Sequence, residues 1–205
     1  KKLSTDFTCV SFDLRGHGES PVPPVPYSLD ELVEDMETLR KRLRHERIHV
    51  VGHSLGGQIG PAYARTHPDY VQTVVLLSTA AGRTPEESAK VKEVVNIMRE
   101  KGVSPLLQTL INRWFTDEFI ANSPDIVEAR IKQVIETPKE VFLSVFDIYA
   151  ATEMLQWLPQ LKCPCLVMTG EFDEGCSPVL NNLIADSLPK AELVILKNLK
   201  HSILI

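Results

Sequence analysis

The sequence predicts an α/β protein, with a mostly parallel sheet, helices on both faces of the sheet and a helical insertion. Two observations support this prediction. Short β-branched runs alternate with amphipathic stretches over residues 7–77, which is the pattern of repeated βαβ units. Strand-like runs are then missing over residues 84–151, where we expect about four helices, and they return near the carboxyl end.

The elements of this frame follow one another in a regular order. We expect strands where β-branched and aromatic residues cluster, and helices where apolar residues recur every three or four positions. In chain order they are a strand over Phe7–Asp13, a helix opened by Ser28, a strand over Ile48–Val51, a helix over Leu55–Thr66, and strands over Val71–Leu77, Cys165–Thr169 and Glu192–Leu196.

Several helix starts carry capping signals. Ser28–Glu31, Thr84–Glu87 and Thr137–Glu140 each place a hydroxyl residue three positions before a glutamate, which predicts a capping box. The last two add a proline at the first helical position. The basic run Arg40–His45 closes the first helix, where cations complement the helix dipole, and we interpret it as a solvated end.

The composition of the 205 residues excludes several classes of function. A net charge of -5 gives no electrostatic reason to expect nucleic acid or an anionic membrane. No apolar run approaches the roughly 18 residues that a membrane span needs. The four cysteines lack the spacing of a zinc site and are expected to be reduced. We therefore expect a cytoplasmic protein with a small-molecule substrate and no nucleic-acid or membrane partner.

The pentapeptide Gly52-His53-Ser54-Leu55-Gly56 matches G-x-S-x-G, the nucleophile elbow. It stands where a strand is expected to become a helix, which is the context that the motif requires. There, flanking glycines leave room for a tight turn, and helix N–H groups, including that of Leu55, point toward the serine. The alternative is a tight connection that happens to contain Ser54.

A nucleophilic serine needs a base, and two histidines lie downstream of Ser54. His67 ends the helix that Ser54 begins, about 20 Å away at 1.5 Å per residue, and is interpreted as structural. His201 follows the last expected strand, at the carboxyl edge where parallel sheets build their sites. The sequence therefore predicts His201 as the base.

The base in turn needs an orienting acid, and three carboxylates follow the strand that precedes His201. We expect Asp173 to be this acid and Glu171 and Glu174 to lie on the surface. The resulting chain order, serine then acid then histidine, is the order of α/β-hydrolases.

With these residues, the chain resembles the serine-nucleophile branch of the α/β-hydrolase superfamily over essentially its whole length. Asp13–Ser20, D-L-R-G-H-G-E-S, resembles the D-x-R-G-x-G-x-S segment after the family's fourth strand. Gly52–Gly56 is similar to its elbow, and Gly170–Asp173 to its acid loop. The resemblance implies the α/β-hydrolase fold, no metal and no organic cofactor, an oxyanion hole that includes the N–H of Leu55, and the catalytic triad Ser54, Asp173 and His201.

A finer resemblance concerns the helical insertion. Arg113–Phe119 and Ile131–Pro138 resemble 3-oxoadipate enol-lactonases and related carboxylesterases, which hydrolyse small esters or a carboxylate-bearing enol-lactone. The resemblance implies that Arg113 clamps an acidic group and that Trp114 lines the pocket, with His53 as a further substrate contact. The alternative is that Arg113 solvates a helix face while Trp114 packs the insertion onto the sheet.

The resemblance also divides the chain into segments. Residues 1–82 form the first part of the hydrolase core, 83–152 a helical cap and 153–205 the second part of the core. The family takes its second oxyanion donor from a loop after its third strand, and no such segment precedes residue 1. We therefore expect a piece of a longer natural chain that lacks the first strands and the last helix and is poorly folded or inactive alone.

The leading interpretation is a serine hydrolase that cleaves a small carboxylic ester or lactone through an acyl-enzyme intermediate. Its rivals with the same triad are a C–C bond hydrolase, a thioesterase, a peptidase and a cofactor-free haloperoxidase. An alternative of a different class is a ligand receptor that keeps the triad but turns over little.

Overall fold

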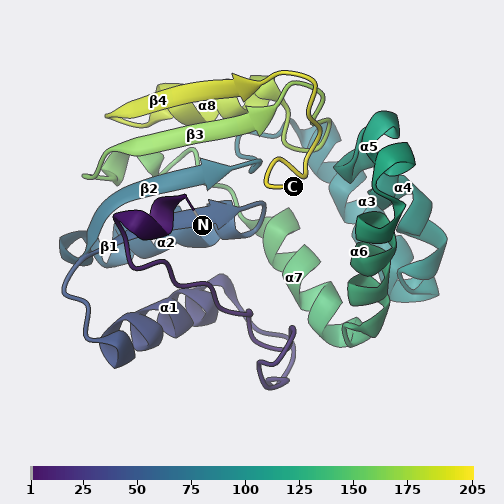
Figure 1. Ribbon diagram of the computed structural model, residues 1–205, viewed down its shortest axis with the longest axis horizontal. Helices are drawn as coiled ribbons and strands as arrows, with labels where there is room; N and C mark the ends of the chain where they lie inside the picture. The colour runs from purple at the N-terminus through teal and green to yellow at the C-terminus, as the bar shows by residue number, and fades with distance from the viewer. Residues whose placement is uncertain (1) are drawn as a thin grey trace.

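The computed structural model describes residues 2–205 and contains one four-stranded sheet in the order β1-β2-β3-β4 (Figure 1). All three strand pairs are parallel, which confirms the predicted α/β class. The strands are β1 (Ile48–His53), β2 (Val71–Leu77), β3 (Cys165–Gly170) and β4 (Ala191–Leu196).

Three helices belong to the sheet layer, namely α1 (Leu29–Leu43), α2 (Gly56–Thr66) and α8 (Pro178–Ser187). Helices α2 and α8 pack on strands whose β-branched side chains are buried, such as Val74 in β2 and Val167 in β3, and α1 packs on α2. Tyr63 of α2 is completely buried in the same cluster. This continuous core holds the strands at fixed positions, and the strand ends carry the candidate site.

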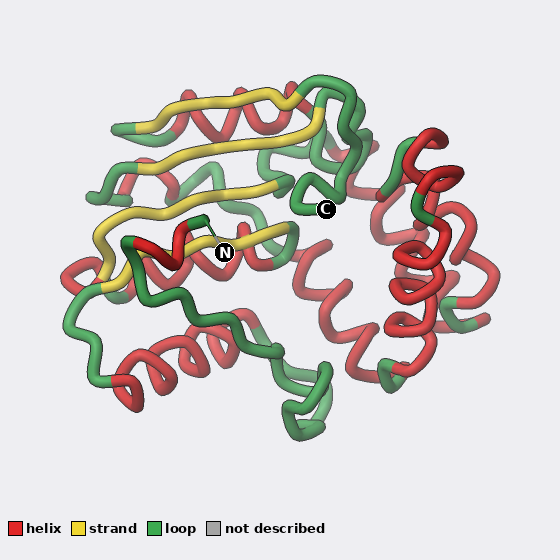
Figure 2. The backbone as a smooth tube through the Cα atoms, in the orientation of Figure 1, coloured by secondary structure: helices red, strands yellow, loops and turns green. Residues whose placement is uncertain are grey.

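Five α-helices follow β2 and precede β3, where about four helices were expected; we call residues 83–152 the helical insertion. They are α3 (Pro85–Lys101), α4 (Leu107–Trp114), α5 (Asp117–Asn122), α6 (Pro124–Glu136) and α7 (Lys139–Ala151). Figures 1 and 2 show them beyond the end of the sheet toward which the strand arrows point. Within residues 2–205, no helix is both long enough and apolar enough to cross a bilayer.

The predicted strand over Phe7–Asp13 is wrong, because this segment is irregular. Strand β1 forms an edge of the sheet, and β2 is the strand that pairs with it. The segment makes no ladder with β1; the Phe7 ring instead lies 5.4 Å from the His49 ring, edge to face. Without a neighbouring strand to pair with, β-forming residues such as Val10 stay exposed.

Two of the three predicted capping boxes are confirmed, at Ser28 and at Thr84. The third is wrong, because α7 begins at Lys139 and Thr137 does not cap it. The Thr137 hydroxyl instead donates to the carbonyl of Gln133, 2.8 Å away, at the end of α6. The Thr137 hydroxyl therefore caps the carboxyl end of α6 and does not accept a hydrogen bond from the first turn of α7.

The basic end of α1 is only partly solvated, because Arg40 is buried. Its guanidinium donates to both oxygens of the buried Glu37 carboxylate, at 2.7 and 2.8 Å, and Tyr63 donates to Glu37 at 2.7 Å. The hydrogen bonds from Arg40 are the main reason that the pKa of Glu37 falls to about 2, although burial opposes this. This cluster joins α1 to α2.

We predict that Glu37→Gln lowers the free energy of unfolding by about 3 kcal/mol at pH 7, because it leaves the Arg40 charge buried and unpaired. The pKa of Glu37 is depressed from 4.5, so its contribution is full above pH 4.5 and is lost as the pH falls toward 2. Urea unfolding at pH 7 and pH 3 measures both effects. The exposed Glu34→Gln is the control, and equal losses in the two variants would contradict the prediction.

Candidate active site

Ser54 occupies a sharp turn between β1 and α2. Its φ of 56° lies in the left-handed region, which is unfavourable for a residue with a side chain. The turn is held by hydrogen bonds from Ser54 N to the carbonyl of Leu77 in β2, 2.8 Å, and from Gly57 N to Ser54 O, 2.9 Å. The next residue, Leu55, stands at the amino end of α2, where the first amides of a helix lack an i−4 partner.

Asp173 and His201 meet at the carboxyl ends of β3 and β4. Asp173 is 3% exposed, and its Oδ2 accepts a 2.8 Å hydrogen bond from His201 Nδ1. Its Oδ1 accepts from the backbone amides of Gly175 and Cys176, at 3.1 and 2.8 Å. Of the three carboxylates considered from the sequence, Asp173 is therefore the one beside His201. Glu171 accepts from the Asn198 amide and Glu174 is exposed.

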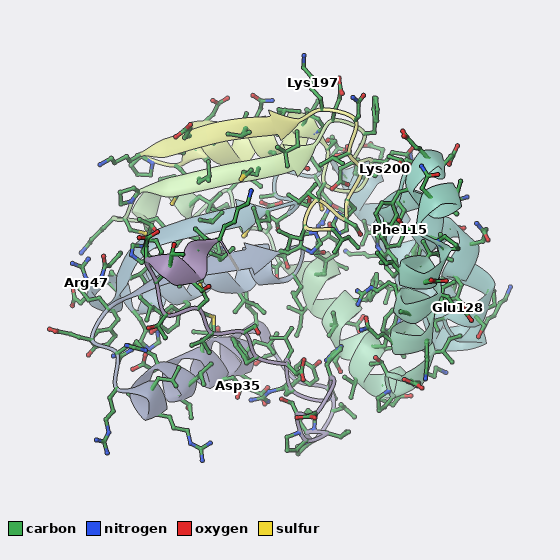
Figure 3. All side chains as sticks on the ribbon, viewed as in Figure 1. Asp35, Arg47, Phe115, Glu128, Lys197 and Lys200 are labelled. Atoms are coloured by element: carbon green, nitrogen blue, oxygen red, sulfur yellow. The ribbon has the colours of Figure 1, made fainter. Side chains whose placement is uncertain are left out.

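Backbone contacts tie the loops of Asp173 and His201 together. A Cβ at Gly170 would overlap the carbonyl oxygens of Leu199 and Lys200, so glycine lets these loops pass each other. The amide of Phe172 donates to Leu199 O, 2.8 Å. Lys200 then donates from Nζ to the carbonyl of Asn112 in α4, 2.7 Å, which anchors the His201 loop to the helical insertion (Figure 3).

The Asp173–His201 pair is electrostatically coupled. Burial, the largest influence, disfavours the charge on each residue, but their hydrogen bond and mutual attraction, together with the contacts that each makes with Cys176, outweigh it. The pKa of Asp173 is lowered and that of His201 is raised. Asp173 therefore holds a proton on Nδ1, and the other ring nitrogen of His201 remains free to exchange one.

His53 contacts His201. Its Nε2 lies 2.8 Å from the carbonyl oxygen of His201, and the two rings are 4.8 Å apart. Burial, with the nearby His201 charge, lowers the pKa of His53 to about 4, so the ring is neutral and donates from Nε2. His53 thus ties the serine turn to the His201 loop. Its contact with substrate stays a prediction.

The structure does not bring Ser54 into hydrogen-bond contact with His201. Among residues 2–205, the Ser54 hydroxyl has no hydrogen-bond partner. Hydrogen bonds between a nucleophile and its base are often loose without substrate and tighten in the substrate complex. The hydroxyl is therefore free, and the elbow and the His201 loop are joined through His53.

Cys176 is a member of the site that the sequence interpretation missed. Its buried thiol lies 3.1 Å from the Tyr149 hydroxyl, and its Sγ lies within 4.8 Å of ligand atoms of Asp173 and His201. These three ligand types suit zinc, but the Asp173–His201 hydrogen bond already joins two of them. Cys176 stands three residues after Asp173 in the sequence, but this spacing alone does not show that its thiol lies beside His201.

The two residues of the helical insertion that the sequence analysis named, Arg113 and Trp114, lie in different surroundings. The carbonyl of Trp114 accepts a 2.9 Å hydrogen bond from the amide of Ser202, directly after His201. Arg113 is exposed and has no hydrogen-bond or ion-pair partner among the described residues. Arg113 as a substrate clamp stays a prediction, whereas Trp114 lies beside the His201 loop.

A family model described as the alpha/beta hydrolase fold matches residues 1–118, which is more than half of the chain. The chain belongs to the alpha/beta hydrolase family. Among curated proteins it is similar to 3-oxoadipate enol-lactonase 2 of Acinetobacter baylyi, with 28% identity over 188 residues. That match covers 92% of this chain and 70% of the relative.

Two solved structures of hydrolases are also similar. The enol-lactonase from Burkholderia xenovorans LB400 superimposes with a TM-score of 0.83 and 29% identity, covering 93% of this chain and 72% of the other. A thermophilic esterase from Thermogutta terrifontis, with malate bound, gives a TM-score of 0.81 and 27% identity, covering 93% and 71%. These findings confirm the predicted superfamily and the likeness to enol-lactonases.

We predict that the two glycines of the hydrolase elbow differ in tolerance. A Cβ at Gly52 would overlap the backbone carbonyl of Gly56, whereas a Cβ at Gly56 would meet nothing within 4 Å. Gly52→Ala should therefore yield insoluble or strongly destabilised protein. Gly56→Ala should keep the fold and gain up to about 1 kcal/mol, because alanine favours helix over glycine. Thermal unfolding compares them, and similar midpoints would contradict this reading of the turn.

Proposed function

We propose that this protein is a serine hydrolase that cleaves a small carboxylic ester or lactone through an acyl-enzyme intermediate. The observation that carries the proposal is the 2.8 Å hydrogen bond between His201 and Asp173, at the same edge of the sheet as a serine in left-handed backbone. His53, which bonds the His201 carbonyl, joins the two parts. Ser54 is the nucleophile, His201 the general base and Asp173 its orienting acid.

The proposed mechanism follows from which atoms are free. Because Asp173 engages Nδ1 of His201, Nε2 is the ring nitrogen left to act as base. It takes the proton of Ser54 Oγ while this oxygen attacks the carbonyl carbon, and the N–H of Leu55 stabilises the oxyanion. His201 then gives the proton to the leaving alkoxide. Water, deprotonated by His201, hydrolyses the acyl-serine and releases the acid.

The substrate class is supported by the relatives. The two similar proteins named as enol-lactonases and the one named as an esterase favour an ester or lactone over the thioester, C–C bond and receptor alternatives. The helical insertion then acts as a cap that bounds the substrate beyond the strand ends. Turnover of aryl esters, lactones, thioesters and dienones under identical conditions would rank these reactions.

We predict that Ser54→Ala lowers kcat for a simple aryl ester by about 10⁴-fold or more, because the nucleophile is lost. A fluorophosphonate probe should label the native protein and not this variant. Ser54→Gly controls for misfolding. It should be equally inactive yet more stable than Ser54→Ala by about 1 kcal/mol, because glycine tolerates the left-handed φ. Ester turnover that survives Ser54→Ala would refute the proposal.

We predict that kcat/KM rises with pH through a midpoint above 6.5, because His201 must lose its proton to act as base and Asp173 raises its pKa. Asp173→Asn should lower this midpoint and reduce kcat by about 10⁴-fold. The measurement is a pH profile from 5 to 10. Glu174→Gln, an exposed change in the same loop, should leave the midpoint in place. An unmoved midpoint in Asp173→Asn would count against the assigned pair.

A further inference from the structure

A buried thiol that the proposed mechanism does not use lies beside the Asp173–His201 pair. Cys176 is 1% exposed, and ligand atoms of Asp173, Cys176 and His201 all lie within 4.8 Å of one another. Within residues 2–205, this is the one group of three histidine, cysteine or acidic side chains that comes together so closely. Imidazole, thiolate and carboxylate are the ligand types that zinc takes in proteins. The cluster therefore has the chemistry of a metal site.

Outer hydrogen bonds already hold the carboxylate and the imidazole of this cluster in place. Asp173 Oδ1 accepts from the amides of Gly175 and Cys176 at 3.1 and 2.8 Å, which leaves Oδ2 facing Nδ1 of His201. The carbonyl of His201 accepts a 2.8 Å hydrogen bond from His53. Such outer partners orient the ligands of metal sites and strengthen binding of the ion.

The thiol has an outer partner of the same kind. The Tyr149 hydroxyl lies 3.1 Å from Cys176 Sγ. Cysteine binds metal as the thiolate, and a hydroxyl that donates to this sulfur stabilises the anion. Tyr149 therefore supports the charged form of Cys176 that an ion requires.

The spacing of the ligand atoms is close to what a tetrahedral zinc ion needs. Bonds of about 2.0 to 2.3 Å place neighbouring ligand atoms about 3.4 to 3.6 Å apart. The 2.8 Å separation of His201 Nδ1 and Asp173 Oδ2 must open by about 0.6 Å, because the ion replaces the proton that they share. The Cys176 sulfur must approach from a separation of at most 4.8 Å. Rotation of the side chains supplies both changes without a shift of the strands.

We infer that Asp173, Cys176 and His201 bind a thiophilic divalent cation such as Zn²⁺, and that the bound ion blocks hydrolysis. On binding, the Nδ1 proton of neutral His201 is replaced by one on Nε2, and the Cys176 thiol releases its proton to solvent. Nε2 then carries a proton and cannot accept that of Ser54. The metal site does not depend on the proposed hydrolase function, whereas the inhibition rests on it.

Cobalt(II) is a direct probe of this site, because a thiolate–cobalt bond gives a charge-transfer band in the near ultraviolet. We expect the native protein to bind Co²⁺ with this band and Zn²⁺ to displace it. Cys176→Ser should remove the band. Tyr149→Phe, which keeps the ring and carbonyl contacts with Arg83, should weaken Co²⁺ binding by about 10-fold or more. The exposed Cys9→Ser is the control and should keep both the band and the affinity. A band that persists in Cys176→Ser, or Co²⁺ binding without a band, would overturn the inference.

Inhibition gives a second readout. Zn²⁺ should inhibit turnover of an aryl ester, and a chelator should restore it. Relative to its own uninhibited rate, Cys176→Ser should need at least about 100-fold more Zn²⁺, since loss of even an outer partner of a ligand costs about 10- to 100-fold in affinity. Equal inhibition of the native protein and Cys176→Ser would contradict the assigned ligand.

The native protein tests the site without any substitution, in case the buried Cys176→Ser variant does not fold. X-ray absorption at the zinc edge should show one sulfur neighbour at about 2.3 Å. Zinc bound through nitrogen and oxygen alone would overturn the inference. The two proposals fail separately. If Ser54→Ala retains turnover, the hydrolase proposal fails and the metal site stands on the cobalt band; if only the sulfur ligand is missing, the hydrolase proposal stands.

Discussion

The parallel pairing of β1 to β4 is the constraint on which the rest of the structure depends, because it brings the carboxyl ends of all four strands to one edge. Ser54 follows β1, and its amide extends the pairing to the last residue of β2. Asp173 follows β3 and His201 follows β4. His53 and His201 are thus 148 residues apart in sequence and in direct contact. The sheet, rather than any single loop, sets the geometry of the site.

The fold was predictable wherever local sequence determines structure. The caps at Ser28 and Thr84 need only residues three positions apart, and both form as expected. The Thr137 cap fails locally, because its hydroxyl bonds the carbonyl of Gln133, but the other failures involve partners distant in sequence. Phe7–Asp13 has the composition of a strand, but pairing depends on a neighbour that its own residues do not specify. Arg40 belongs to a run of charges, and only the packing of α1 on α2 buries it against Glu37.

The residues of the candidate site could be anticipated from motif and chain order, and Asp173 lies beside His201 as expected. The residues that surround this pair could not be anticipated from the sequence, for a physical reason. Cys176 lies beside the pair only in three dimensions, and no local pattern distinguishes a thiol beside the histidine from a buried structural one.

The helical insertion is linked to the acid loop through a chain of polar contacts. Arg83, at its start, donates from Nη1 to the Tyr149 carbonyl at 3.3 Å and stacks 4.3 Å from the centre of that ring. The Tyr149 hydroxyl meets Cys176, whose amide donates to Asp173. Within residues 2–205, Nε and Nη2 of Arg83 are buried without a hydrogen-bond partner, which costs free energy of desolvation. The ring and the carbonyl of Tyr149 are the contacts that stabilise this cation. A shift of α7 would remove both Tyr149 contacts from Arg83 and would also move the Tyr149 hydroxyl away from Cys176. The position of the insertion and the orientation of Asp173 therefore depend on each other.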